Sequence, residues 1–180
     1  MNKSKALGFM FVLLLGSAAV YSLSSKKIDE LENHGKQPAG LIPSILLDNQ
    51  AKEVSPDQLS GKYVGLYFSA SWCGPCRSFT PELIRFRNQH QDEFEVILVG
   101  GDGSPKDQAK YIEKYDMPWL AMINQSEAAK QASKQLSVQY IPYLVILDPS
   151  GKVVSEEGVK EVRSQKMGAM ELWKSAPKGA

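Results

Sequence analysis

Both cysteines of the 180-residue chain lie in a single Cys-x-x-Cys motif, Cys73-Gly-Pro-Cys76. The apolar run over 64–69 predicts a buried strand before the motif, and amphipathic spacing predicts a helix over 75–90 after it. At the start of a helix this spacing lets two sulfurs reach bonding distance, and the unpaired N–H groups there stabilise a thiolate. The motif therefore predicts a redox-active pair, in which Cys73 exchanges with a substrate and Cys76 resolves the mixed disulfide.

Other uses of a Cys-x-x-Cys motif fit this sequence less well. A zinc site needs further Cys or His ligands, but the two histidines, His34 and His90, do not complete any zinc-finger spacing. A purely structural bridge across two residues would restrict the unfolded chain very little. We therefore predict no metal site, and no cofactor, because the two sulfurs can carry both electrons.

The overall composition is that of one globular domain. Apolar residues make up 43% and charged residues 23%, and 21 basic residues against 20 acidic ones give a net charge of +1. These values exclude a disordered chain, a collagen-like chain and a multi-span membrane protein. The lack of a basic excess also argues against nucleic acid as a partner.

The first 23 residues differ from the rest of the chain. A short basic start, 1–5, precedes the uncharged apolar stretch Ala6–Leu23. This pattern predicts a signal peptide, with Ser17 and Ala19 at the positions that must be small for cleavage. An uncleaved membrane anchor is the alternative, because 18 residues lie at the lower limit for a bilayer span. Both interpretations predict export, to the periplasm or an equivalent compartment, with membrane contact through this segment only.

The remainder divides into a polar linker over 24–40 and one domain over 41–175. Within the domain, apolar runs predict strands over 42–47, 64–69, 94–99 and 143–147, with a return strand from Val153. Amphipathic or capped stretches predict helices over 75–90, 107–115, 127–136 and 159–173. In the last of these helices the inward positions are expected to be Val162, Met167, Met170 and Trp173. Alternation of strands and helices predicts an α/β domain with a mixed sheet and helices on both faces.

Three motifs in this order resemble the thioredoxin superfamily, in particular its tryparedoxin and nucleoredoxin branch. They are Tyr67-Phe-Ser-Ala-Ser-Trp-Cys-Gly-Pro-Cys-Arg-Ser-Phe-Thr-Pro81, then Met117-Pro-Trp-Leu-Ala121, then Ile141-Pro142. The resemblance covers roughly residues 42–155. It implies a thioredoxin-like α/β/α sandwich and a thiol–disulfide oxidoreductase. Because of its predicted export, the chain is also similar to bacterial membrane-tethered thioredoxins of cytochrome maturation, which are the alternative within the superfamily.

The resemblance also implies how the substrate groove is built. In this superfamily the proline equivalent to Pro142 is cis and faces the two cysteines, which would leave the backbone of Ile141 free to pair with a substrate strand. Trp72 would provide a flat apolar platform for the docked peptide. Gly74 and Pro75 complete the groove, and this pair resembles the reducing members. We therefore predict a reductant of protein disulfides that is kept reduced by an upstream dithiol donor.

One position departs from thioredoxin itself. Tyr67 lies six residues before Cys73, where thioredoxin has a buried acid. A phenol with an ordinary pKa of about 10 cannot replace a carboxylate as a proton relay near neutral pH, so Cys76 needs another proton partner, which the sequence does not identify. Trp119 could form a wall of the site or pack in the core. The alternative function is a non-enzymatic binding module or chaperone that uses the same groove.

Overall fold

The computed structural model describes residues 40–176. The predicted signal peptide or anchor over 1–23, and all but the last residue of the predicted linker, lie outside this range. Within residues 40–176 none of the helices combines the length and the apolar character needed to cross a bilayer.

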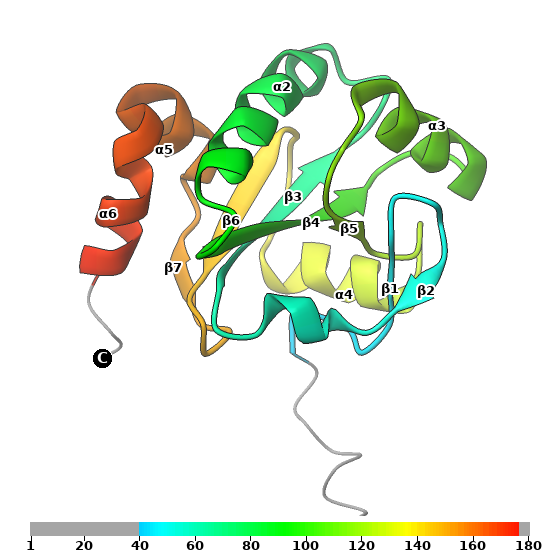
Figure 1. The fold of residues 1–180 in the computed structure, drawn as a ribbon. Helices are drawn as coiled ribbons and strands as arrows, with labels where there is room; N and C mark the ends of the chain where they lie inside the picture. The colour runs from blue at the N-terminus through cyan, green and yellow to red at the C-terminus, as the bar shows by residue number, and fades with distance from the viewer. Residues whose placement is uncertain (1–39, 177–180) are drawn as a thin grey trace, which may run out of the picture. The chain divides into compact units, whose positions relative to one another are not determined.

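A seven-stranded mixed sheet forms the centre of the domain (Figure 1). The strands are β1 (Leu46–Leu47), β2 (Glu53–Val54), β3 (Tyr63–Ser69), β4 (Phe94–Gly100), β5 (Leu120–Ala121), β6 (Tyr143–Leu147) and β7 (Val153–Ser155). Their order across the sheet is β2-β1-β5-β4-β3-β6-β7. β3 and β4 run parallel, as do β4 and β5. On the other side of β3, β6 pairs antiparallel with β3, and β7 pairs antiparallel with β6.

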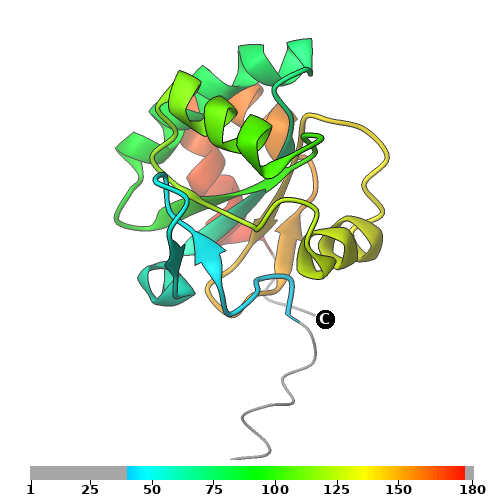
Figure 2. The same cartoon turned by 90° about the vertical axis from the view of Figure 1, so that its right-hand side faces the viewer.

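Helices cover both faces of this sheet, as the sequence predicts. The α-helices are α2 (Gly74–Gln89), α3 (Pro105–Tyr115), α4 (Glu127–Gln135), α5 (Gly158–Gln165) and α6 (Ala169–Ser175), and the short 3-10 helices are η1 (Pro56–Leu59) and η2 (Lys166–Gly168). α2, α3, α5 and α6 enclose one apolar core, whereas α4 and η1 enclose a second core on the opposite face. Figures 1 and 2 show α4 on the other side of the sheet from α2 and α3.

The predicted helix over 159–173 is wrong in one respect. The chain forms α5, η2 and α6 in succession instead of one helix. α5 ends at Gln165 because the next residue, Lys166, adopts a φ of 49°, which lies outside the right-handed helical region. Val162, Met170 and Trp173 are buried as expected, but Met167 is 43% exposed rather than inward. The break shifts the phase of the apolar positions, so Met167 falls outside the buried face.

The edge of the sheet also differs from the prediction. The expected strand over 42–47 pairs only at Leu46 and Leu47, and β2 and β5 were not predicted. Each of these strands has two residues, which is too short for an alternating pattern to show. Their pairing depends on neighbours far away in sequence, such as Leu47 opposite Ala121.

The position of the site follows from the parallel pair at the centre. β3 and β4 lie in register from Tyr63 opposite Phe94 to Ser69 opposite Gly100. Their carboxyl ends therefore meet at one edge of the sheet, where parallel sheets generally hold their sites. The turn that leads from β3 into α2 and the loop that follows β4 lie side by side there.

Candidate active site

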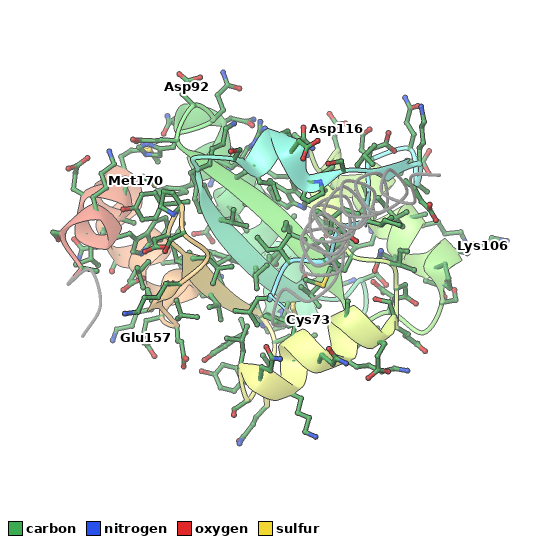
Figure 3. The ribbon with its side chains drawn as sticks, turned by 90° about the horizontal axis from the view of Figure 1, so that it is seen from below. Cys73, Asp92, Lys106, Asp116, Glu157 and Met170 are labelled. Atoms are coloured by element: carbon green, nitrogen blue, oxygen red, sulfur yellow. A yellow bond between two sulfur atoms is a disulfide. The ribbon has the colours of Figure 1, made fainter. Side chains whose placement is uncertain are left out.

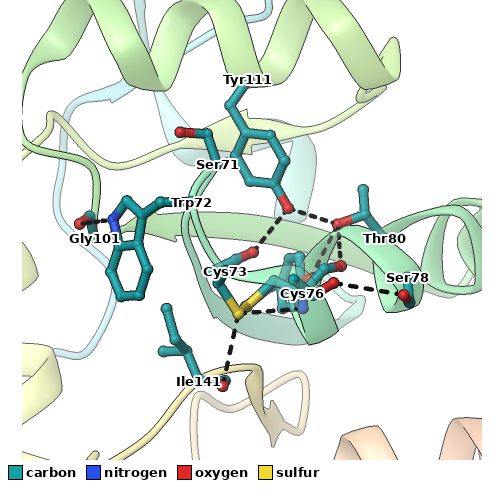
Figure 4. Close-up of a disulfide and its surroundings, with 12 residues drawn as sticks. Ser71, Trp72, Cys73, Cys76, Ser78, Thr80, Gly101, Tyr111 and Ile141 are labelled. Atoms are coloured by element: carbon teal, nitrogen blue, oxygen red, sulfur yellow. Dashed lines mark hydrogen bonds between the residues drawn. A yellow bond between two sulfur atoms is a disulfide. The ribbon is translucent and has the colours of Figure 1, made fainter.

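The two cysteines form a disulfide at the start of α2 (Figure 4). Cys73 is the N-cap residue of the helix, and its Cα lies 5.2 Å from that of Cys76. The backbone N–H of Cys76 donates to Cys73 Sγ over 3.2 Å. This N–H is one of the helix donors that lack an intrahelical partner, so it would equally stabilise a thiolate on Cys73. Pro75, which has no N–H, occupies the first turn, where no donor is required.

The platform residue Trp72 is fixed by the loop that follows β4. Trp72 is 66% exposed, yet its indole N–H donates to the carbonyl of Gly101 over 3.2 Å. Beside it, the backbone N–H and the hydroxyl of Ser71 both donate to Asp102 Oδ1, over 2.9 and 2.6 Å. These bonds join the loop after β4 to the turn before Cys73, so the exposed indole has a defined orientation.

Ile141 comes to the disulfide from another part of the sequence. It packs against Cys73 and Cys76, and its carbonyl oxygen lies 3.7 Å from Cys73 Sγ. The Ile141–Pro142 peptide bond is cis, as the family resemblance implies. The structure thus places Ile141 beside the Cys73–Cys76 pair. The roles of Ile141, Pro142, Trp72, Gly74 and Pro75 in substrate binding stay predictions.

Four buried hydroxyl groups, those of Tyr67, Ser69, Thr80 and Tyr111, form a cluster behind Cys76. Figure 4 labels Thr80 and Tyr111 of this cluster. Thr80 Oγ1 donates to the carbonyl of Cys76 over 3.0 Å, and Tyr67 Oη donates to the same oxygen over 3.2 Å. Tyr111 Oη lies 2.8 Å from Thr80 Oγ1 and 3.0 Å from Ser69 Oγ. One assignment of the hydroxyl protons satisfies these contacts: Ser69 donates to Tyr111, Tyr111 donates to Thr80, and Thr80 donates to the carbonyl of Cys76. The four side chains are at most 1% exposed.

Tyr67, the first tyrosine of this cluster, is neutral at physiological pH. Burial first, and then the neighbouring Tyr111, raise the pKa of Tyr67 well above its ordinary value of 10.0. The hydroxyl of Tyr67 therefore donates and accepts hydrogen bonds as a neutral group. It does not supply the negative charge of the buried acid that thioredoxin has at this position.

The sequence pointed to Tyr67 but not to the other three members of the cluster, Ser69, Thr80 and Tyr111. Thr80 lies four residues after Cys76 on α2, a spacing at which a hydroxyl reaches back to a helix carbonyl. This signal was present in the sequence. Tyr111 could not be found in the same way, because it reaches Ser69 across 42 residues of intervening chain.

Trp119 occupies the second of the two positions that the sequence left open for it, a place in the core. Trp119 is 3% exposed, and its ring and that of Tyr67 form a T-shaped pair with centroids 6.4 Å apart, so Trp119 packs in the core rather than forming a wall of the groove.

Comparisons with known proteins agree with this fold. A family model described as Thioredoxin-like matches residues 61–153. A probable nucleoredoxin 1 of Arabidopsis thaliana is 42% identical over 67% of this chain and 21% of its own length. A tryparedoxin of Trypanosoma brucei brucei is 37% identical over 69% of this chain and 88% of its own length. The solved structure of tryparedoxin II from C. fasciculata has a TM-score of 0.65 and 34% identity, and the match covers 71% of this chain and 85% of that one.

A thioredoxin-like fold with a Cys-x-x-Cys pair at the start of α2 defines a class of proteins, the thioredoxin-like oxidoreductases. This chain belongs to that family, in the branch that holds the tryparedoxins and nucleoredoxins. It spans only about a fifth of the length of the nucleoredoxin from Arabidopsis thaliana, but most of the length of the tryparedoxin.

Proposed function

We propose that this protein is a thiol–disulfide oxidoreductase that reduces disulfides of protein substrates. The thiolate of Cys73 attacks one sulfur of the substrate disulfide, forms a mixed disulfide, and displaces the other substrate sulfur as a thiolate, which takes up a proton. Cys76, after losing its proton, then attacks Cys73 Sγ and releases the second substrate sulfur as a thiol. The substrate gains two electrons and two protons, and the protein is left with the Cys73–Cys76 disulfide.

The observation that carries this proposal is the position of the disulfide itself. Cys73 Sγ accepts the N–H of Cys76. Cys73 is 5% exposed and follows the exposed Trp72 in the chain, whereas Cys76 is 0% exposed. An attacking sulfur needs a donor to stabilise its thiolate and a path to the substrate, and Cys73 has both. A resolving sulfur needs only to reach its partner, which the shared helical turn ensures.

The direction of electron flow and the location are further parts of the proposal. Gly74-Pro75 is the pair found in reducing members of the superfamily, so we propose that an upstream dithiol donor reduces the Cys73–Cys76 disulfide after each turnover. The composition of residues 1–23 supports an exported location, with the domain either released or tethered. A fusion of residues 1–40 to a reporter that is active only outside the cytoplasm tests the location independently of the chemistry.

Disulfides of small thiols are a second candidate class of substrate. A structural neighbour, tryparedoxin II, has been solved as a complex with glutathionylspermidine, at 31% identity and a TM-score of 0.65. Measuring the rate of reduction of a protein disulfide and of a small-thiol disulfide at equal concentration tests which class this chain prefers.

Reduction of insulin by the purified domain, with a chemical dithiol as electron donor, tests the function. We expect turnover by the wild type and none above background by the Cys73→Ser variant. Measurement of the reduction potential tests the direction, and a value near that of thioredoxin, about −270 mV, supports a reductant. A potential above about −150 mV would instead indicate an oxidant. If the wild type bound unfolded peptides but did not turn over insulin, the binding module or chaperone would be the better interpretation.

A further inference from the structure

Two cavities of similar size flank the Ile141–Pro142 bond. The α5-side cavity, of about 520 Å³, includes Pro142, Glu156 and Lys160 in its lining. The α4-side cavity, also of about 520 Å³, lies between α4 and the carboxyl ends of β3 and β4, and its walls include Phe68, Val99, Gly101, Ala129 and Ile141. A cavity of this size accommodates several residues of a peptide or a ligand of comparable size.

The α4-side cavity borders the active site through two of its wall residues. Gly101, one of its wall residues, accepts the indole N–H of Trp72, and Ile141, another, packs against Cys73. Figure 4 shows Trp72 and Gly101 on one side of the disulfide and Thr80 on the other. A substrate bound at Cys73 therefore has this cavity immediately beside its reacting sulfur.

The two cavities differ in charge. The α5-side cavity contains both signs, and its Lys160 pairs with Glu157 over 3.5 Å. In the described part of the chain, the ionisable groups that line the α4-side cavity are two lysines, Lys130 and Lys134, with no carboxylate among the lining residues.

The two lysines lie on one face of α4. A spacing of four residues places Lys130 and Lys134 on adjacent turns, on the same side of the helix. Both are exposed, and neither forms an ion pair within residues 40–176. Two free ammonium groups at the rim of an apolar cavity attract a carboxylate that is carried on an apolar stem.

We propose that the α4-side cavity binds an acidic segment of the substrate polypeptide, next to the disulfide that Cys73 attacks. This inference rests on the proposed function and names the kind of substrate that the site favours. The apolar walls contact the stems of the bound residues, and Lys130 and Lys134 pair with their carboxylates. The occupant is a polypeptide because the proposed substrate is a protein disulfide, and the residues that flank its reacting cysteine lie nearest to this cavity.

The test uses three disulfide-linked peptides that differ only beside the cysteine, where they carry two glutamates, two glutamines or two lysines. The reduced protein is mixed with each peptide in a stopped-flow instrument, and the second-order rate constant is followed by tryptophan fluorescence at low and high salt. For the wild type we expect the acidic peptide to react about fivefold faster than the neutral one at low salt, with the difference reduced at high salt.

The informative variant is Lys130→Gln/Lys134→Gln, which we expect to bring the ratio of acidic to neutral rates close to one. The matched control is Lys106→Gln/Lys110→Gln, which removes the same net charge from an exposed pair at the same spacing on α3. Figure 3 shows Lys106 at the edge of the domain, away from Cys73 and from α4. An unchanged ratio in the α4 variant, or an equal loss in the control, would overturn the inference.

A binding measurement separates this inference from the proposed function. The same peptides with serine in place of cysteine are titrated into the oxidised protein, and the backbone amide shifts of α4 are followed by NMR. Tighter binding of the acidic peptide, lost in Lys130→Gln/Lys134→Gln, supports the acidic site even if no peptide is reduced. Reduction of the neutral peptide without any acidic preference in rate or binding leaves the proposed function intact and contradicts the site.

Discussion

The two sides of one disulfide differ sharply in what surrounds them. Around Cys73 lie the exposed indole of Trp72 and the carbonyl of Ile141, which belong to a turn and a loop. Behind Cys76 lies a closed cluster of hydroxyls, in which Tyr67 and Thr80 both donate to the Cys76 carbonyl. The open side consists of groups that a substrate can reach, and the closed side consists of groups that find all their partners within the protein.

This difference fits the separate tasks that we propose for the two cysteines. The Cys73 side must change partners during each turnover, so it cannot be enclosed. The Cys76 side holds the first turn of α2 in place through bonds that are buried and thus stronger than exposed ones. A rigid turn keeps Cys76 within reach of Cys73, so the closed side supports the chemistry of the open side without touching the substrate.

The largest expected effect comes from exchanging the two cysteines for serine, one at a time. Cys73→Ser removes the attacking sulfur and should lower disulfide reduction by about a thousandfold or more. Cys76→Ser keeps the attacking sulfur but removes the resolving one, so it should accumulate a stable mixed disulfide with a substrate peptide. Mass spectrometry under non-reducing conditions detects the adduct. Equal trapping by the two variants would show that the sulfurs are equivalent and would break the comparison.

Removal of one hydroxyl from the closed side should reduce stability. Tyr67→Phe leaves the ring packed but removes a donor to the Cys76 carbonyl, and we expect the free energy of unfolding to fall by about 1–3 kcal/mol. Urea unfolding of the oxidised protein measures this loss. The control is Tyr63→Phe on the same strand, since the Tyr63 hydroxyl makes no hydrogen bond within residues 40–176; its effect should stay within about 0.5 kcal/mol. A similar loss in both variants would count against a special role for the cluster.

The closed side should also produce a pH dependence in the alkaline range. Folding raises the pKa of Tyr67 above its ordinary value of 10.0, chiefly through burial, so above pH 10 the unfolded chain loses a proton that the folded chain retains. The contribution of this group to stability is therefore complete below pH 10 and declines as the pH rises, by up to about 1.4 kcal/mol per pH unit.

Tyr67→Phe removes that proton from both states. The gap in the free energy of unfolding between wild type and variant should therefore narrow progressively above pH 10, and urea titrations at pH 9, 10 and 11 measure it. A constant gap across these pH values would mean that the Tyr67 hydroxyl titrates equally in the folded and unfolded chains.

The smallest expected effect concerns the open side. Trp72→Ala removes an exposed ring, so the free energy of unfolding should change by no more than about 0.5 kcal/mol. The value of kcat/KM for a protein disulfide should fall by about fivefold, because an aromatic anchor beside the reacting sulfur is lost. Met167→Ala is the control, since Met167 is exposed on η2. A fall in stability without a change in rate would make Trp72 a structural residue and would remove the distinction between the two sides.

Much of the fold could be predicted because its signals are local. β3, β4 and β6 are continuous apolar runs, and the helix predicted over 107–115 is α3, which begins two residues earlier at Pro105. Its N-cap is Ser104, whose hydroxyl accepts the N–H of Asp107. The order of these elements determined a mixed sheet with helices on both faces. The short strands and the interruption at Lys166 could not be predicted, because two-residue pairings and a single backbone angle leave no periodic trace in a sequence.

The site shows the same division. The sequence by itself determined the redox pair, its place between a strand and a helix, and the exposed tryptophan beside it, since all of these lie within a few residues of Cys73. Only the tertiary structure decided that Ile141 borders the attacking sulfur, that Tyr111 completes the hydroxyl cluster behind Cys76, and that Lys130 and Lys134 line the neighbouring cavity. These contacts join residues that are between about 30 and 70 positions apart, and such distances close only when the parallel strands and their helices pack into one sheet.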